Sequence, residues 1–146
     1  MERELIKISV RELVEFILRT GDIDNRVGGK KDAESMLAGA RIHRKIQKSM
    51  GSDYHAEVTL KHLIPMEKFD LQIEGRADGI IEGDPVTIDE IKGIYKSLEF
   101  LKGPVPVHLA QAKCYAYIYG LQNEKTTMKV QMTYVNLDTE QKVYFQ

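Results

Sequence analysis

Two acidic side chains stand on the two strands of a predicted hairpin. Asp78 precedes and Glu90 follows the short segment Gly83-Asp84-Pro85. If these three residues form the whole turn, the antiparallel register places Asp78 opposite Glu90 and Arg76 opposite Lys92, with opposed Cβ atoms about 4.5 to 5.5 Å apart. Carboxylates this close repel each other unless a cation lies between them, and hard divalent ions such as Mg²⁺ prefer oxygen ligands. The pair therefore predicts a divalent-cation site, provided that the register does not slip by one residue.

A plainer interpretation assigns the same four residues to surface ion pairs on a solvated hairpin face. Exposed ion pairs are common and contribute little to stability. Against this interpretation, the two acidic residues lie inside segments that read as core strands, 75–81 and 86–92. Composition alone favours ion pairs, whereas the local sequence favours the cation site.

Gln111 and Tyr115 form a second candidate pair, because residues four apart lie one above the other on a helix. The face that they share differs from an apolar stripe, which we expect to be the core face of this helix and which comprises Ala110, Cys114, Tyr117, Ile118 and Leu121. Ordinary packing and solvation would also explain a lone glutamine and tyrosine on a helix.

His43 lies beside the apolar stripe of another predicted helix, which begins after the cap Asp32 and ends near Gly51. The stripe comprises Met36, Leu37, Ala40, Ile42, Ile46 and Met50. A histidine in this place is either a partly buried packing residue, which is the commoner case, or a metal ligand.

The other predicted elements position these candidates. Ser9 and Glu12 form a capping box, which starts a helix that runs to about Arg19. The polar, glycine-containing segment 21–31 predicts a loop, and two prolines delay the third helix until residues 107–119. Alternation of apolar and polar residues predicts strands at 56–64, 69–82 with an irregularity near Gly75, 86–91, 127–136 and 142–146.

Four motifs occur in order along the chain: Gly-x-x-x-His at 39–43, Gly-x-x-Asp at 75–78, Glu-x-Lys at 90–92 and Gln-x-x-x-Tyr at 111–115. Together they resemble the PD-(D/E)xK nucleases, in the subfamily of the RecB-type and CRISPR-associated adaptation nucleases, although Ala77 stands where the signature has proline. The resemblance covers residues 36–120. It implies an α/β (α+β), restriction-endonuclease-like fold in which helices flank a central mixed β-sheet. It also implies that residues 1–146 are one nuclease-like domain of a longer chain.

The resemblance implies roles for the site residues. His43, Asp78, Glu90 and the backbone carbonyl of Ile91 would bind Mg²⁺ or Mn²⁺, and Lys92 would orient or deprotonate the attacking water. The implied catalytic residues are Asp78, Glu90, Lys92, Gln111 and Tyr115, the last two of which help to place the lysine and the DNA. The basic residues that are candidate phosphate contacts are Arg41, Arg44, Lys45, Lys48, Arg76, Lys96, Lys102 and Lys113.

The implied function is that of a metal-dependent deoxyribonuclease, an exonuclease that acts in DNA repair or processing beside, or fused to, a helicase. The alternative is a noncatalytic DNA-binding or assembly module that keeps the nuclease fold. A ribonuclease or a structure-specific endonuclease would share the same site.

Composition narrows these expectations. Cys114 is the one cysteine among 146 residues, which excludes a disulfide framework and the four-cysteine iron–sulfur cluster that some relatives carry. It also indicates a reducing compartment, so we expect a cytoplasmic protein. No apolar run approaches the roughly 18 residues of a membrane span. The net charge of -1 argues against holding nucleic acid by bulk electrostatics, without excluding a local basic groove.

Overall fold

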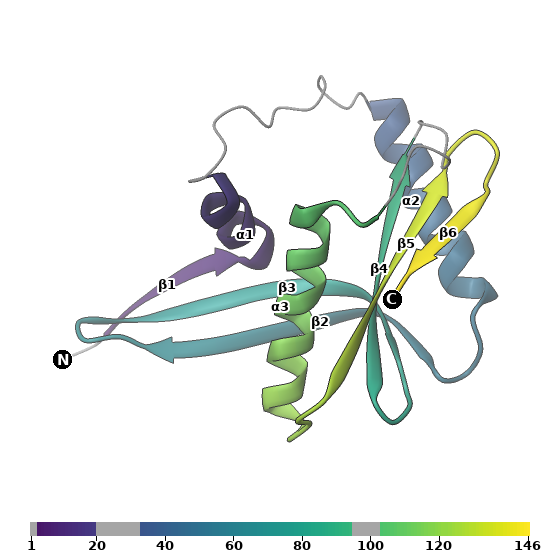
Figure 1. The fold of residues 1–146 in the computed structure, drawn as a ribbon. Helices are drawn as coiled ribbons and strands as arrows, with labels where there is room; N and C mark the ends of the chain where they lie inside the picture. Colours follow the sequence, from purple (N-terminus) through teal and green to yellow (C-terminus); the bar gives the residue numbers. More distant parts are fainter. Residues whose placement is uncertain (1–2, 20–32, 95–102) are drawn as a thin grey trace.

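The computed structural model describes residues 3–19, 33–94 and 103–146. The helices and strands in this part of the chain are β1 (Glu4–Ser9), α1 (Val10–Arg19), α2 (Ala33–Ser49), β2 (Tyr54–Pro65), β3 (Phe69–Ile81), β4 (Val86–Ile94), α3 (Pro106–Gln122), β5 (Met128–Asn136) and β6 (Lys142–Phe145). The strands form one mixed sheet, which the helices flank (Figure 1). This confirms the predicted α+β class. The predicted loop at 21–31, the cap Asp32 and the basic residues Lys96 and Lys102 lie outside the described residues.

The sheet has two parts that share β3. β2 pairs with β3 in antiparallel fashion along its length, and β1 pairs in parallel with residues 69–74 of β3. Only residues 79–81 of β3 pair with β4, which itself pairs in parallel with β5, and β5 then pairs with β6. In Figure 1 the long β2–β3 ribbon runs across the molecule, whereas β4, β5 and β6 run steeply beside it. We call the point where β3 and β4 separate, just beyond the Gly79–Asp89 pair, the fork.

The β3–β4 hairpin has the register that a turn at 83–85 requires. The paired residues are Gly79 with Asp89, Ile80 with Ile88, and Ile81 with Thr87. The next pair in this register is Asp78 with Glu90, so the two carboxylates lie at the mouth of the fork, on adjacent strands.

Two apolar clusters hold the helices against the sheet. The larger one includes Ile88 of β4 and residues of α1 and α3, whereas the smaller one joins Ile42 and Ile46 of α2 to Ile91 and Val135. Because side chains alternate between the two faces of a strand, Glu90 shares the α3 face with Ile88. Asp89 shares the α2 face with Ile91.

The capping box at the start of α1 is confirmed. The backbone N–H of Glu12 donates to Ser9 Oγ at 3.0 Å, and the backbone N–H of Ser9 donates to Glu12 Oε1 at 3.4 Å. Each side chain thereby satisfies a backbone donor that the first helical turn leaves free.

Among the described residues, no helix is long and apolar enough to cross a bilayer.

The predicted core faces of two helices are partly wrong. On α3 the buried residues are Gln111, Ala112, Tyr115, Ala116, Ile118 and Gly120. Ile118 is therefore buried as predicted, but Tyr117 is 63% exposed and Leu121 49% exposed. The reason is that α3 rests on the sheet through its Gln111–Tyr115 face. On α2, Leu37 is also exposed, because the packing of this helix on the sheet begins at Ile42.

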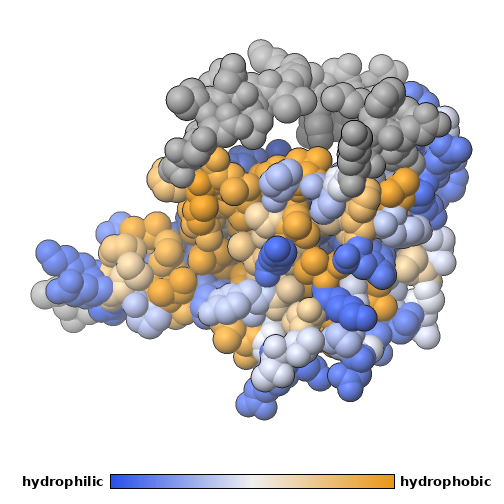
Figure 2. Space-filling model, viewed as in Figure 1, coloured by the Kyte–Doolittle hydropathy of each residue, from blue (hydrophilic) through white to orange (hydrophobic). Residues whose placement is uncertain are grey.

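Two features of the N-terminal half differ from the sequence-based expectation. The strand β1 is not predicted, because its alternating residues are mostly exposed and carry little core signal. The irregularity expected near Gly75 lies instead in β2, where Glu57 has a φ of 56° and the pairing with β3 is interrupted. Figure 2 shows apolar side chains gathered over α1 and the β2–β3 ribbon. The large apolar residues exposed in this half are Leu5 and Ile6 of β1, Phe16, Ile17 and Leu18 of α1, Leu63 of β2, and Met66 of the β2–β3 turn.

Candidate metal centre

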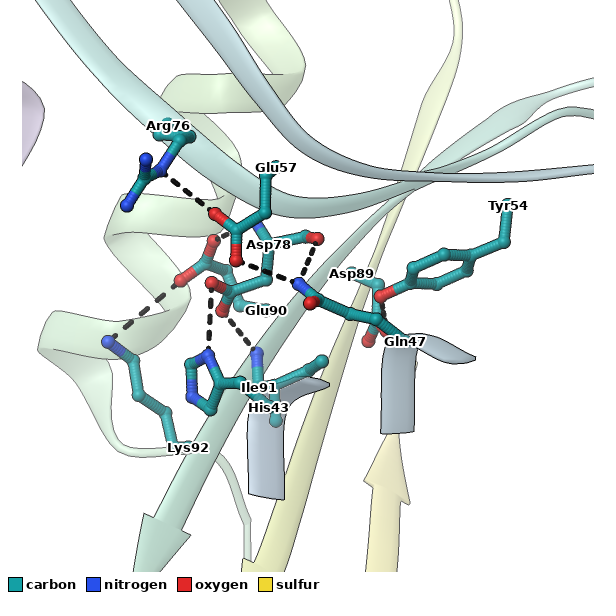
Figure 3. Close-up of polar contacts among 10 residues, drawn as sticks. All are labelled: His43, Gln47, Tyr54, Glu57, Arg76, Asp78, Asp89, Glu90, Ile91 and Lys92. Atoms are coloured by element: carbon teal, nitrogen blue, oxygen red, sulfur yellow. Dashed lines mark hydrogen bonds and ion pairs between the residues drawn. The ribbon is translucent and has the colours of Figure 1, made fainter. Parts of the chain in front are cut away.

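At the fork, hydrogen bonds to side-chain carboxylates replace the main-chain hydrogen bonds between β3 and β4 (Figure 3). The backbone N–H of Ile91 donates to Asp78 Oδ2 at 2.7 Å, and the backbone N–H of Asp78 donates toward Glu90 Oε1 at 3.4 Å. The two predicted carboxylates therefore meet as the hairpin register requires. They also hold the strands together at the point where the main-chain pairs stop.

His43 reaches the same carboxylate from α2. Its Nδ1 lies 3.4 Å from Asp78 Oδ1, and its side chain is 27% exposed. The neighbouring Ile42 and Ile46 anchor α2 on Ile91 and Val135, which leaves the imidazole at the edge of that packing. His43 therefore points at the fork and not into the core, which favours the ligand interpretation over the packing one.

Glu57 completes a group that sequence reasoning missed. One ligand atom from each of His43, Glu57 and Asp78 lies within 4.8 Å of the others. Gln47 of α2 links the two acidic residues, because its Nε2 donates to Glu57 Oε1 at 3.0 Å and to the carbonyl oxygen of Asp78 at 2.9 Å. Counting the β2–β3 register from a turn at 66–68 places Glu57 opposite Asp78, so the sequence held a signal for this residue.

Glu90 lies on the other side of Asp78 and is almost completely buried. Burial raises the pKa of Glu90 to about 8, and the nearby negative charge of Asp78 adds to the rise. Lys92 opposes it, with its Nζ 3.9 Å from Glu90 Oε2. Glu90 is not part of the His43–Glu57–Asp78 group. The predicted ligand set is therefore only partly assembled, with Glu57, in place of Glu90, grouped with His43 and Asp78.

Two basic side chains balance the acidic ones. Arg76 Nε lies 2.9 Å from Glu57 Oε2, so Arg76 faces β2 and not Lys92 as the hairpin count predicted. The pairing of β3 with β4 ends at Gly79 and Asp89, which is why the predicted Arg76–Lys92 opposition does not form. At the fork, three carboxylates thus face two basic side chains and one imidazole.

Gln111 and Tyr115 of α3 are both buried, and Tyr115 lies beside this acidic group. A Cβ placed on Gly75 would lie 2.7 Å from Tyr115 Cε1, so the glycine of Gly-x-x-Asp makes room for the tyrosine of Gln-x-x-x-Tyr. Burial raises the pKa of Tyr115, and the charges of Glu90 and Asp78 raise it further, which keeps its hydroxyl protonated. The Oε1 of Gln111 is buried and has no hydrogen-bond partner among the described residues.

The predicted DNA contacts are exposed where the structure describes them. Arg41, Arg44 and Lys48 of α2 and Lys113 of α3 are exposed. Lys45 is also exposed, but its Nζ lies 2.6 Å from Glu140 Oε1. The exposed basic side chains therefore lie on both helices that supply site residues.

Gly39, the glycine of the Gly-x-x-x-His motif, is not required by a close neighbour in the way that Gly75 is required by Tyr115. Among the described residues, no atom outside its own helix turn comes within 4 Å of a Cβ built on Gly39. We expect Gly39→Ala to raise the free energy of unfolding by about 0.5 to 1 kcal/mol, because alanine loses less backbone entropy in a helix. Urea unfolding followed by circular dichroism measures this change.

Gly120→Ala is the matched control, because a Cβ there would lie 3.1 Å from the carbonyl oxygen of Lys125. This second helical glycine is expected to show no gain. A loss of stability in Gly39→Ala would contradict the prediction and indicate a close neighbour at this position.

Comparison with known proteins bears on the fold. No family model matches the sequence, and no curated protein matches it. The crystal structure of SSO0001 superimposes with a TM-score of 0.66 over 99% of this chain and 68% of that one. The two sequences are 19% identical. The chain shares its fold with SSO0001. At this level of identity the likeness concerns the fold alone and leaves the activity to be argued from the site.

Proposed function

We propose that the chain is a divalent-cation-dependent deoxyribonuclease of the PD-(D/E)xK, RecB-like type. The observation that carries the proposal is the position of Asp78 at the fork. His43 lies against its carboxylate, Glu90 accepts from its backbone N–H, and Lys92 lies beside Glu90. Surface ion pairs do not require a nearly fully buried glutamate next to a second carboxylate. A cation-binding centre accounts for such a pair, because a divalent ion between the two carboxylates would offset their repulsion.

The donor atoms suit Mg²⁺ or Mn²⁺. Carboxylate oxygens are preferred by both ions, and one imidazole nitrogen shifts the preference toward Mn²⁺. Asp78 and His43 would be ligands, joined by Glu57 from β2 or by Glu90 from β4. When bound, the ion would supply an acidified water and polarise a phosphate oxygen. No iron–sulfur cluster is part of the proposal, because the sequence contains one cysteine.

Lys92 is the residue that would act on the attacking water. Its ammonium group lies next to Glu90 at the fork and is partly exposed, so it reaches both the carboxylates and the solvent side. There it would orient or deprotonate the water and offset the negative charge that develops on the phosphate. The unpaired Oε1 of Gln111 would accept a hydrogen bond from this lysine or from a water at the site.

The substrate side of the proposal rests on the exposed basic residues. The exposed Arg41 and Arg44 of α2 and Lys113 of α3 would contact phosphates, and Arg76 lies at the fork itself, paired with Glu57. We further propose, from the motif resemblance, an exonuclease that works in DNA repair or processing with a helicase in the cytoplasm.

The test is a cleavage assay on end-labelled single-stranded and double-stranded DNA, linear and circular, with Mg²⁺, Mn²⁺ or EDTA. An exonuclease degrades the linear substrates and spares the circles. Lys92→Ala should lose cleavage but retain Mn²⁺ binding, since the lysine acts on water and not on the ion. Binding of DNA without cleavage under either cation would support the noncatalytic module, and cleavage of an RNA oligonucleotide alone would redirect the substrate assignment.

Cation binding is expected to depend on pH through Glu90. The folded-state pKa of about 8 lies above the ordinary value of 4.5, so between these values the folded state binds one more proton than the unfolded state. Stability without metal should therefore fall as pH rises from about 5 to 8, by on the order of a few kcal/mol. A bound cation replaces that proton, so the melting temperature should rise more on adding Mn²⁺ at pH 8.5 than at pH 6.5.

Differential scanning fluorimetry with and without Mn²⁺ across this pH range gives the measurement. Glu90→Gln should remove the difference between the Mn²⁺ responses at the two pH values and reduce the fall in metal-free stability, because the amide does not titrate. A smaller fall remains, since burial also raises the pKa of Asp89. Glu67→Gln, at an exposed turn position, is the matched control and should behave like the wild type. A metal-free melting temperature that rises steadily between pH 5 and pH 8 would contradict the assignment of this proton to Glu90.

A further inference from the structure

A buried carboxylate lies directly behind the site, on the α2 face of β4. Asp89 is 1% exposed and accepts three hydrogen bonds. Tyr54 Oη donates to its Oδ2 at 2.7 Å, Thr133 Oγ1 donates to its Oδ1 at 2.7 Å, and Gln131 Nε2 donates to Oδ1 at 3.3 Å. In turn, Gln131 Oε1 accepts from Gln146 Nε2 at 2.8 Å, which orients the amide nitrogen of Gln131 toward Asp89. Figure 3 shows Tyr54 and Asp89 together, beside Asp78 and Glu90.

Tyr54 makes this contact by crossing a whole strand. It belongs to β2 and pairs with Ile81 of β3, yet its hydroxyl reaches Asp89 of β4. The ring passes over Gly79, where a Cβ would lie 2.0 Å from both Cζ and Oη of Tyr54. One carboxylate on β4 is therefore tied to β2 across β3 on one side, and to β5 through Thr133 on the other.

The position of this tie is specific to the fork. Asp89 and Gly79 are the last main-chain pair before β3 and β4 separate. At the next residues, backbone-to-carboxylate bonds replace the main-chain pairs: the N–H of Asp78 donates toward Glu90 Oε1, and the N–H of Ile91 donates to Asp78 Oδ2. If the pairing of β3 with β4 ended at a different residue, the distance between the Asp78 and Glu90 side chains would therefore change.

A buried carboxylate is a costly way to join strands. Removing a charge from water costs several kcal/mol, and apolar residues of similar size often stabilise such a site more. Fixed hydrogen bonds behind a ligand are, however, the usual means of holding it in a binding geometry. The three donors around Asp89 provide such hydrogen bonds at the last paired residue before the fork, which directly precedes Glu90 in the chain.

We propose that Asp89 is a positioning residue for the metal centre: held by Tyr54 and Thr133, it fixes the fork and so the separation of the Asp78 and Glu90 carboxylates. The role of Asp89 in metal binding rests on the proposed function. Its effect on where β3 and β4 separate can be tested without a metal.

The test compares Thr133→Val, Thr133→Ser and Asp89→Asn with the wild type. Thr133→Val keeps the size of the side chain and removes one donor, whereas Thr133→Ser keeps the hydroxyl and should behave like the wild type. Thr87→Val, a half-buried threonine of β4, is the matched control. Because Thr133→Val and Thr133→Ser are small changes at a buried position, they keep the test decisive even if Asp89→Asn does not fold.

Two measurements are made on each variant. Amide hydrogen exchange, followed by NMR without metal, reports the fork through the Ile91 N–H, which is bonded to Asp78. Thr133→Val should lose protection at Ile91 while the amides of Ile88 and Met132 stay protected. Isothermal titration with Mn²⁺ should show a dissociation constant raised about tenfold or more, with cleavage recovered within a few-fold at saturating Mn²⁺.

The outcomes separate the two proposals. Unchanged protection at Ile91 in both Thr133→Val and Asp89→Asn overturns the positioning role, whatever the metal does. Lost protection with unchanged Mn²⁺ affinity also overturns it, because Asp89 would then serve only the fold. If the wild-type protein binds no Mn²⁺ while Ile91 responds as expected, the proposed function fails and the control of the fork stands.

Discussion

Asp78→Asn is expected to abolish cation-dependent cleavage, with a loss of roughly a thousandfold or more in rate. Asp78 links α2 and β4 at the site. Its Oδ2 accepts from the Ile91 N–H, its Oδ1 lies against His43, and its carbonyl oxygen accepts from Gln47. The substitution keeps the size of the side chain but removes its charge. A bound cation contributes several kcal/mol to the stabilisation of transition-state charge, and about 1.4 kcal/mol corresponds to a factor of ten.

The measurement is the initial rate of hydrolysis of a labelled DNA with Mn²⁺ and Mg²⁺, together with Mn²⁺ binding by titration. Both should be lost in Asp78→Asn. Asp84→Asn removes an equal charge from the exposed turn of the same hairpin and should leave both unchanged. Cleavage by Asp78→Asn within tenfold of the wild-type rate would remove Asp78 from the metal centre and, with it, the proposed function.

The parts of the site that the sequence predicts are those set by local rules. A three-residue turn and two alternating strands fix the register of the hairpin, so the meeting of Asp78 and Glu90 follows from residues within 12 positions of each other. The order of the motifs adds His43, which the structure places against Asp78. Capping by Ser9 at the start of α1, and Pro104 and Pro106 at the start of α3, set helix starts that also depend on near neighbours alone.

The parts that the sequence does not predict depend on distant pairing. Glu57 joins the site only because β2 lies on β3 and because its own backbone adopts a left-handed conformation. In the sequence, Asp89 is a charged residue within an apolar strand, and nothing near it explains its burial. Its hydrogen-bond donors are Tyr54, 35 residues earlier, and Thr133, 44 residues later. For α3, hydrophobicity identifies only part of the buried face. Ile118 is buried as predicted, but Tyr115 joins the apolar core and Gln111 is buried as well, whereas Tyr117 and Leu121 are exposed.

Gly79→Ala is expected to lower the free energy of unfolding by about 3 kcal/mol or more, which is the largest stability effect that we expect from a single methyl group in this chain. The added Cβ would lie 2.0 Å from two atoms of the Tyr54 ring. Tyr54 cannot yield without breaking its 2.7 Å bond to Asp89. Overpacking costs about 1 to 3 kcal/mol, and a buried carboxylate that loses a donor adds about as much.

Urea unfolding of four proteins isolates the clash from other effects of the alanine: wild type, Gly79→Ala, Tyr54→Ala and the double variant. Tyr54→Ala is itself destabilising, because it opens a cavity and removes the hydrogen bond to Asp89. If the ring is the obstacle, the alanine at position 79 costs little once the ring is gone, so the double variant should be no less stable than Tyr54→Ala. Equal costs of Gly79→Ala with and without the Tyr54 ring would show that the strand itself, and not the path of Tyr54 to Asp89, requires glycine there.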